Sequence, residues 1–329
     1  MHLGNGAVTP ECGLVALGVA AAGVGMATLA ARSFGIDRDR ARTAGALGAA
    51  VFAAQLFNVP IVPFCSVHLI GGVLLAWVLG PALGAITMAC ILSLQAVLLG
   101  DGGLLALGCN IINMGLLPAA VVALAKGTVR GESDYSQKTA ADAREAWKLA
   151  ASAFACTVGA VGLIVLEVSI GRGAEELEGL GAFASQMVLW HLLAGVLEAV
   201  ASVAIVASLA RWAKRDAAEF QLSARGTAWV TTASLLIAVL PALGFTSSVP
   251  DGYRAALASA EQAGLAVGQI DSTAQLAGVS ATLQAWQDGI AAAFPGPEAV
   301  LVVLATALAG LAAWGWARVS SPTVWSSIH

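Results

Sequence analysis

Residues 147–170 read WKLAASAFACTVGAVGLIVLEVSI, and Lys148 and Glu167 are the only charged side chains in this run. As a helix, the segment would extend roughly 36 Å at 1.5 Å per residue, which is enough to cross about 30 Å of hydrocarbon. The whole chain of 329 residues is 58% apolar and 11% charged, and its mean hydropathy is +0.83. Soluble domains do not have this composition, so the sequence predicts an all-α polytopic membrane protein.

Apolar runs of similar length recur along the chain. They lie at about 12–31, 43–60, 103–125, 185–210, 226–245 and 298–317. A longer apolar segment, 69–100, is broken at Gly80-Pro81, and we interpret it as a hairpin of two short spans. With residues 147–170, the sequence predicts about nine transmembrane helices.

Basic residues are concentrated in alternate connections, which predicts the orientation, because Lys and Arg are retained on the cytoplasmic side. They follow the first span and also lie between the fifth and sixth and between the seventh and eighth spans: Arg32, Arg38, Arg40, Arg42, Lys126, Arg130, Lys138, Arg144, Lys148, Arg211, Lys214, Arg215 and Arg225. We therefore expect the N-terminus outside and the C-terminus in the cytoplasm. This orientation places His2, His68, Asp101 and the start of the span containing His191 near the outer face.

The apolar pattern divides the chain into two modules. Residues 1–245 form a seven-span domain, and residues 246–329 form a second module. We expect an extracytoplasmic loop domain over 246–297, a final span over 298–318 and a short cytoplasmic tail. No polybasic patch is present, so we expect contact with membrane lipid and not with nucleic acid.

His2 directly follows the initiator Met1. The α-amine of Met1, the amide nitrogen of His2 and its imidazole Nδ1 can close adjacent chelate rings around one ion. Such a tetragonal nitrogen field suits Ni(II) or Cu(II). A second polar island, Ser66-Val67-His68, lies between two prolines and a new apolar run, and the imidazole of His68 would complete a square of four nitrogens.

Other polar residues interrupt the apolar spans, where they are costly and often functional. His191 and Glu198 are seven residues apart and share one helical face, either as a structural pair or as support for ligand passage. Asn110 and Asn113 also share a face and would hold unwound backbone or contact a metal-bearing segment. Asp101 would cap the following helix or orient an imidazole.

Two further features have structural interpretations. We expect Glu167, near the outer end of its span, to be solvated. The five cysteines show no C-x-x-C pair and behave as small hydrophobic residues, although Cys12 and Cys65 lie near the two histidine islands and allow a soft ligand or a disulfide.

An ordered set of motifs resembles the NikM/CbiM family, the substrate-capture (S) subunits of energy-coupling factor transporters for nickel and cobalt. The matching stretches are Met1-His2-Leu3-Gly4-Asn5-Gly6-Ala7-Val8-Thr9-Pro10, Ser66-Val67-His68-Leu69 with Gly71, Leu79-Gly80-Pro81, Gln95-Ala96, Gly100-Asp101-Gly102-Gly103, Asn110, Asn113-Met114 and 191–198. Residues from 246 onward resemble the two-span partner, called NikN or CbiN, here fused.

The resemblance implies that Met1, His2 and His68 hold the metal in a square-planar site. Many relatives carry an acidic residue where this chain has Asn5, which puts affinity or metal preference in doubt. The resemblance also implies a prokaryotic cytoplasmic membrane, Ni²⁺ or alternatively Co²⁺ as transported ligand, no cofactor, and partner subunits that are separate from this chain. These partners are a transmembrane coupling (T) subunit and a pair of cytoplasmic ATPase subunits, since no G-x-x-x-x-G-K-[ST] loop occurs here.

Two other function classes remain open from the residues themselves. A stand-alone ion-coupled secondary transporter would use His191 and Glu198 as a proton relay. An intramembrane metalloenzyme would need a catalytic cluster such as H-E-x-x-H, which the sequence lacks, so we do not expect an enzyme.

Overall fold

The computed structural model describes residues 2–4, 7–57, 59–62, 65–99, 101–126, 143–170, 180–213 and 220–242. The helices are α1 (Pro10–Phe34), α2 (Arg38–Gln55), α3 (Gly72–Leu79), α4 (Pro81–Leu94), α5 (Leu107–Ile111), α6 (Leu117–Lys126), α8 (Ala143–Ser169), α9 (Leu180–Leu209) and α10 (Ala224–Ala242). Two π-helical turns, η1 (Gln95–Leu99) and η2 (Ile112–Leu116), continue α4 and α5, and a 3₁₀ turn, η5 (Ala210–Trp212), follows α9.

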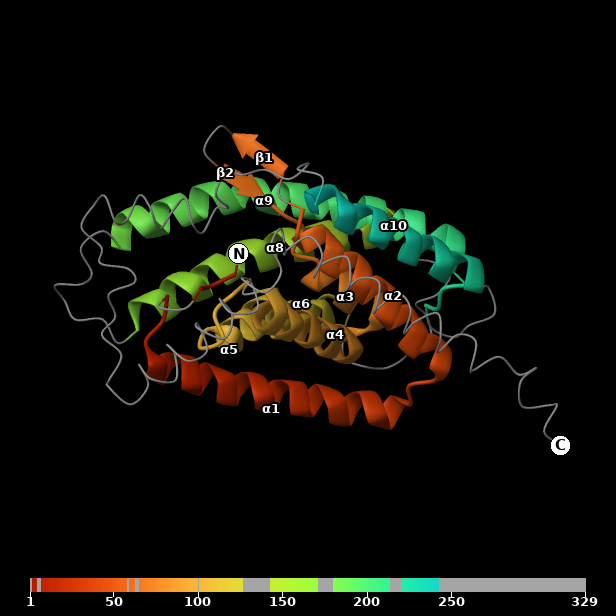
Figure 1. The fold of residues 1–329 in the computed structure, drawn as a ribbon, viewed down its shortest axis with the longest axis horizontal. Coiled ribbons are helices and arrows are strands. Elements are labelled where there is room, and N and C mark those ends of the chain that lie inside the picture. Colours follow the sequence, from red (N-terminus) through yellow and green to blue (C-terminus); the bar gives the residue numbers. More distant parts are fainter. Residues whose placement is uncertain are drawn as a thin grey trace.

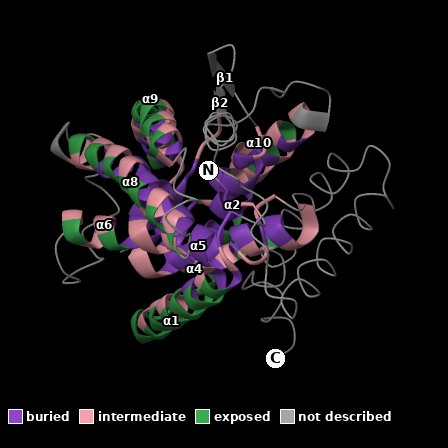
Figure 2. Cartoon of the chain, turned by 90° about the vertical axis from the view of Figure 1, so that its left-hand side faces the viewer, coloured by how far each residue is buried: buried purple, intermediate pink, exposed green. Residues whose placement is uncertain are grey.

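The helices form a bundle with its shortest elements inside. Figure 1 shows α1 along one side, α8 and α9 along the opposite side, and α3 to α6 between them. In Figure 2 the central elements are buried, whereas the outward faces of α1, α8 and α9 are exposed. These exposed faces are rich in Leu and Val, as expected for surfaces that face hydrocarbon.

Five helical stretches in the described part of the chain are long and apolar enough to cross a membrane. They are Pro10–Phe34, Pro81–Leu99, Leu107–Lys126, Glu145–Ser169 and Leu180–Trp212. The predicted all-α polytopic class is therefore confirmed. The count of nine spans stays a prediction, and the outer loop and the last span lie outside the described residues.

The predicted break at Gly80-Pro81 is present, but the first arm of the hairpin is shorter than expected. Gly80 has a φ of 82°, and Pro81 begins α4. Helix α3 has only 8 residues, all of them buried. At about 12 Å it is too short to cross the bilayer alone, so the expected short span is instead a half-length helix enclosed by the bundle.

A small β-hairpin follows α2, where the sequence predicted a helix as far as residue 60. Helix α2 ends at Gln55, and β1 (Val59–Val62) pairs in antiparallel fashion with β2 (Cys65–Val67). Pro60 lies within β1, and proline does not continue a helix because it has no N–H to donate. The hairpin delivers the chain directly to His68.

Glycines at two positions let the central elements approach each other closely. A Cβ on Gly72 would collide with the carbonyl of Met114 and with the ring of Pro118. A Cβ on Gly108 would collide with the backbone of α1 at Ala16 and Leu17. Small residues therefore set the helix spacing in this bundle.

Replacing Gly108 by Ala should destabilise the protein, because the added methyl group must displace the backbone of α1. We expect a loss of about 1–3 kcal/mol, as for other overpacked cores, measured as a lower thermal midpoint in detergent. Gly18→Ala is the matched control, since no atom lies within 4 Å of its Cβ position. Equal midpoints for the two variants would contradict this packing.

Candidate metal centre

The N-terminal segment is fixed in the bundle through one residue, Leu3, which is 0% exposed. Its N–H donates to Oδ1 of Asn110 at 2.9 Å. Its carbonyl accepts from Nδ2 of Asn110 at 3.1 Å and from the N–H of Gly103 at 2.8 Å. Asn110 therefore holds the backbone that carries His2, which is one of the two roles that the sequence left open for it.

His2 is buried at 8% exposure, and its ring stacks on that of His68. The ring centroids are 5.4 Å apart, and the ring planes differ by 13°. Oδ1 of Asp101 lies 3.5 Å from Nδ1 of His2. Gly102, with a φ of 91°, leaves room beside the imidazole, because a Cβ there would lie 3.6 Å from Cβ of His2 and 3.1 Å from Nδ2 of Asn110.

The orientation of His68 follows from one backbone contact. Its Nδ1 lies 3.0 Å from the carbonyl oxygen of Leu69. Since a carbonyl only accepts, the neutral ring carries its proton on Nδ1 and its lone pair on Nε2. This is the tautomer that a metal-ligating Nε2 needs.

The segment 68–71 is held from α9 by Glu198, which is 6% exposed. Oε2 accepts from the N–H of Ile70, and Oε1 accepts from the N–H of Gly71, both at 2.8 Å. Gly71 is the N-cap of α3 and has a φ of 76°. The carboxylate therefore caps the positive end of a buried helix and positions His68 two residues away.

The same segment is also held by Gln55 and Gln95, which the sequence analysis did not name as candidate site residues, although Gln95 stands in one of its motif stretches. Nε2 of Gln55 donates to the carbonyl of Ile70 at 2.7 Å. Nε2 of Gln95, the first residue of η1, donates to Oε1 of Gln55 at 2.8 Å. The sequence feature that could have identified them is the one that identified Asn110, which is an amide side chain within an apolar span.

His191 and Glu198 make different contacts, although they share a helical face as predicted. Nδ1 of His191 lies 2.8 Å from the carbonyl oxygen of Met187 in the preceding turn. Between them in the chain, Gly195 makes room for the side chain of Phe154. A Cβ there would lie 3.0 Å from Cδ2 of Phe154.

Glu167 was expected to be solvated, and this expectation was wrong. It is 8% exposed, and its Oε2 accepts from Nδ2 of Asn113 at 2.8 Å. Asn113 lies in η2, against which α8 packs, so the carboxylate meets an amide of a neighbouring helix instead of water. Cys12 is a free thiol, 3.9 Å from the carbonyl oxygen of Glu167; the side chain of Cys65 lies outside the described part of the chain.

Some predicted site residues are not described. Met1 and Asn5 lie outside the described residues, and Ser66 is described only as backbone in β2. Within the part of the chain that the structure describes, no three His, Cys, Asp or Glu side chains are grouped to hold a metal ion.

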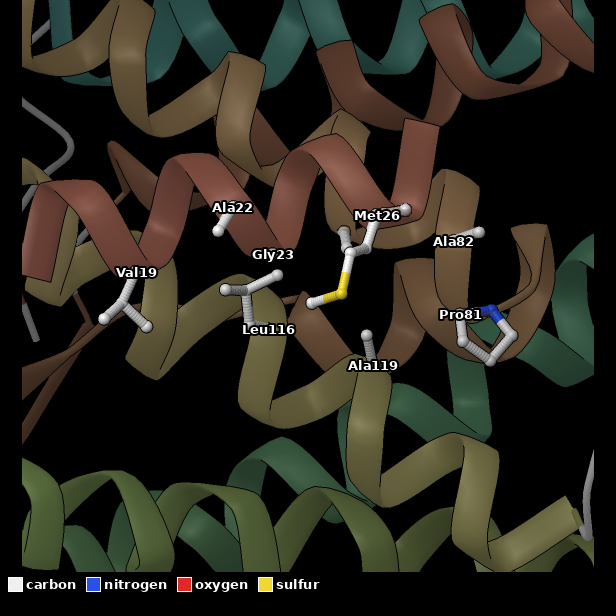
Figure 3. Close-up of a pocket in the computed structure, with 10 residues that line it drawn as sticks. Val19, Ala22, Gly23, Met26, Pro81, Ala82, Leu116 and Ala119 are labelled. Atoms are coloured by element: carbon white, nitrogen blue, oxygen red, sulfur yellow. The ribbon is translucent and has the colours of Figure 1, made fainter. Parts of the chain in front are cut away.

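An apolar groove lies away from the histidines, between α1, α4 and the η2–α6 segment. Its volume is about 470 Å³. Figure 3 shows Met26, Pro81 and Leu116 around it, and every lining side chain is apolar. It offers no oxygen or nitrogen side-chain ligand for a divalent cation.

The family model for the "cobalt uptake substrate-specific transmembrane region", CbiM, matches residues 2–215. This range includes both histidines and every side chain that fixes them. The chain belongs to the CbiM family.

Named relatives agree with this membership. A "putative fused nickel transport protein NikMN" of Archaeoglobus fulgidus is 32% identical over 220 residues, which cover 66% of this chain and 68% of the relative. A "probable fused nickel transport protein LarMN" of Lactiplantibacillus plantarum is 40% identical over 73 residues, 22% of each chain. Like these two, the present chain is a family member fused to a second module; the boundary at 245/246 stays a prediction.

A solved structure has a similar fold. The crystal structure of a truncated transition metal transporter has a TM-score of 0.52 and 26% identity, and the match covers 64% of this chain and 99% of that one. The CbiM-family chain is thus a multi-pass membrane protein of nickel and cobalt transport. A role in transport is consistent with the expectation that this protein is not an enzyme.

Replacing Asn110 by Ala should release the N-terminal segment, because the N–H of Leu3 loses its partner and its carbonyl loses one of two donors. A buried group left unsatisfied costs about 1–3 kcal/mol, so exchange of the Leu3 amide with deuterium should accelerate roughly 5- to 150-fold. Hydrogen–deuterium exchange of the N-terminal peptide measures this. Asn113→Ala, which breaks only the contact with Glu167, should leave that peptide unchanged; acceleration in both variants would refute a specific role for Asn110.

Proposed function

We propose that this chain is the substrate-binding membrane subunit of an energy-coupling factor importer and that it captures Ni²⁺, or alternatively Co²⁺, from outside the cell. The observation that carries the proposal is the stacking of His2 on His68, which brings together two imidazoles from residues far apart in the sequence. Each histidine is held through its neighbouring backbone, Leu3 or Ile70, by a buried polar side chain.

The proposed ligands are four nitrogens: the amine of Met1, the amide and Nδ1 of His2, and Nε2 of His68. The hydrogen bond of His68 to Leu69 supports Nε2 as its ligating atom. The carboxylate of Asp101 lies beside Nδ1 of His2 and would attract a divalent cation. A square nitrogen field suits Ni²⁺ and accommodates Co²⁺; Cu²⁺ binds such donors at least as well, so discrimination against it must come from availability or geometry.

We further propose that uptake requires a transmembrane coupling subunit and a pair of ATPase subunits in a prokaryotic cytoplasmic membrane. The sequence contains no phosphate-binding loop of its own. We place the N-terminus outside and the C-terminus in the cytoplasm.

A stand-alone transporter with a His191–Glu198 relay is less well supported, because both oxygens of Glu198 already accept backbone N–H groups. Uptake that continued without the ATPase subunits would favour that alternative.

Replacing His2 by Ala should abolish tight binding of Ni²⁺, because the N-terminal chelate loses its imidazole and with it the second chelate ring. His68→Ala removes the fourth nitrogen and should weaken Ni²⁺ binding by about 100-fold or more, about 2.7 kcal/mol or more. Isothermal titration of the purified chain with Ni²⁺ measures both. His329→Ala, which alters a histidine outside the proposed site, is the control. Undiminished affinity in the His2→Ala variant would exclude the N-terminal chelate.

Affinity should rise with pH, because the proposed amine, amide and imidazole ligands must each lose a proton to bind the ion. We expect Ni²⁺ to bind at least about tenfold more tightly at pH 8 than at pH 6. Titrations in two buffers of different ionisation enthalpy would also count the protons released. Equal affinity at the two pH values would rule out a chelate with a deprotonated amide.

A further inference from the structure

One buried residue, Gln95, is connected to both halves of the histidine pair. It is 0% exposed and begins the π-helical turn η1. Its backbone carbonyl accepts the N–H of Asp101 at 3.2 Å. Asp101 in turn places Oδ1 at 3.5 Å from Nδ1 of His2. Through its backbone, Gln95 is therefore anchored beside the first imidazole.

The side chain of Gln95 reaches the second imidazole through two hydrogen bonds. Its Nε2 donates to Oε1 of Gln55 at 2.8 Å, and Nε2 of Gln55 donates to the carbonyl of Ile70 at 2.7 Å. Gln55 is 2% exposed, so water does not replace these contacts. Because Ile70 is only two residues from His68, the position of the Gln95 amide bears on the position of His68.

The direction of these hydrogen bonds has one solution. A backbone carbonyl only accepts, so Gln55 must turn its Nε2 toward Ile70 and its Oε1 toward Gln95. Gln95 must then donate through its own Nε2, and its Oε1 is left over. This oxygen is buried and accepts no hydrogen bond from any residue that the structure describes.

The orphaned oxygen argues against a purely structural role for this glutamine. A buried acceptor that has left water without gaining a donor destabilises the folded protein. An apolar side chain would avoid that loss, and the neighbouring Ile91, Leu92 and Ala96 are apolar and buried. A polar residue that weakens the fold at such a place indicates a role in a functional site.

We propose that Gln95 is a positioning residue of the metal site, which holds His68 at a fixed place relative to His2. Its amide acts on His68 through Gln55, while its carbonyl is anchored at Asp101. The imidazoles, with ring centroids 5.4 Å apart, are then ordered before the ion arrives, so binding does not have to order them. Gln95 itself does not bind the ion. This inference rests on the proposed function, because it takes both histidines as ligands.

The test is a cycle of variants of the full chain, titrated with Ni²⁺. Gln95→Met nearly keeps the length of the side chain but removes the amide that donates to Gln55. We expect Ni²⁺ affinity to fall about tenfold, because the segment that carries His68 is held less firmly. In the His68→Ala background the same change should alter affinity by less than about twofold, since the ligand on which the amide acts is gone.

Ser93→Ala is the matched control, because the hydroxyl of Ser93 donates to the carbonyl of Ala89 in its own helix, α4. It should leave Ni²⁺ affinity unchanged. The thermal midpoint of metal-free Gln95→Met in detergent should stay within about 4 °C of the unaltered chain, since one hydrogen bond is lost. If Gln95→Met does not fold, Gln55→Met breaks the same connection and takes its place in the cycle.

Two results would overturn the proposal. One is an equal loss of affinity in the presence and absence of His68, which would mean that the amide acts on the fold in general. The other is an unchanged affinity of Gln95→Met in the chain that retains His68. Failure of the proposed function is distinguishable from both, because His68→Ala alone would then bind Ni²⁺ as tightly as the unaltered chain.

Discussion

Two stretches of non-helical backbone, 2–4 and 68–71, lie inside a helical bundle that spans a membrane. Hydrocarbon offers no hydrogen bonds, so irregular backbone at this depth must be satisfied by protein. Asn110 satisfies Leu3 with both ends of one amide. Glu198 and Gln55 satisfy Ile70 at its N–H and its carbonyl. The placement of the two histidines depends on these few contacts, and not on the loops that carry them.

Helix α3 shows how the same constraint shapes the bundle. It is too short to span the membrane, so both of its ends need partners inside the protein. Glu198 accepts from N–H groups at its N-terminal end. Lys126 donates to the carbonyl of Trp77 near its C-terminal end at 2.8 Å and lies 4.2 Å from the centroid of that ring. Opposite charges therefore match the helix dipole at both ends.

The sequence predicted what depends on local pattern. Long apolar runs predicted the helical stretches, Gly80-Pro81 predicted the break, and the amides and acids within spans selected Asn110 and Glu198. It missed what depends on neighbours brought close by folding. Glu167 looked solvated because its partner, Asn113, is 54 residues away in the chain. Gly80-Pro81 marked the end of α3 correctly, but the pattern did not show that so short a helix is enclosed by its neighbours.

Glu198 joins α9 to the segment that carries His68. Its two oxygens accept the N–H groups of Ile70 and Gly71, so the position of His68 depends on a carboxylate that is 128 and 127 residues away from them in the chain. Hydrocarbon offers those N–H groups no other partner, so a displacement of α9 would carry the segment with it. The candidate site is therefore coupled to a long helix of the bundle.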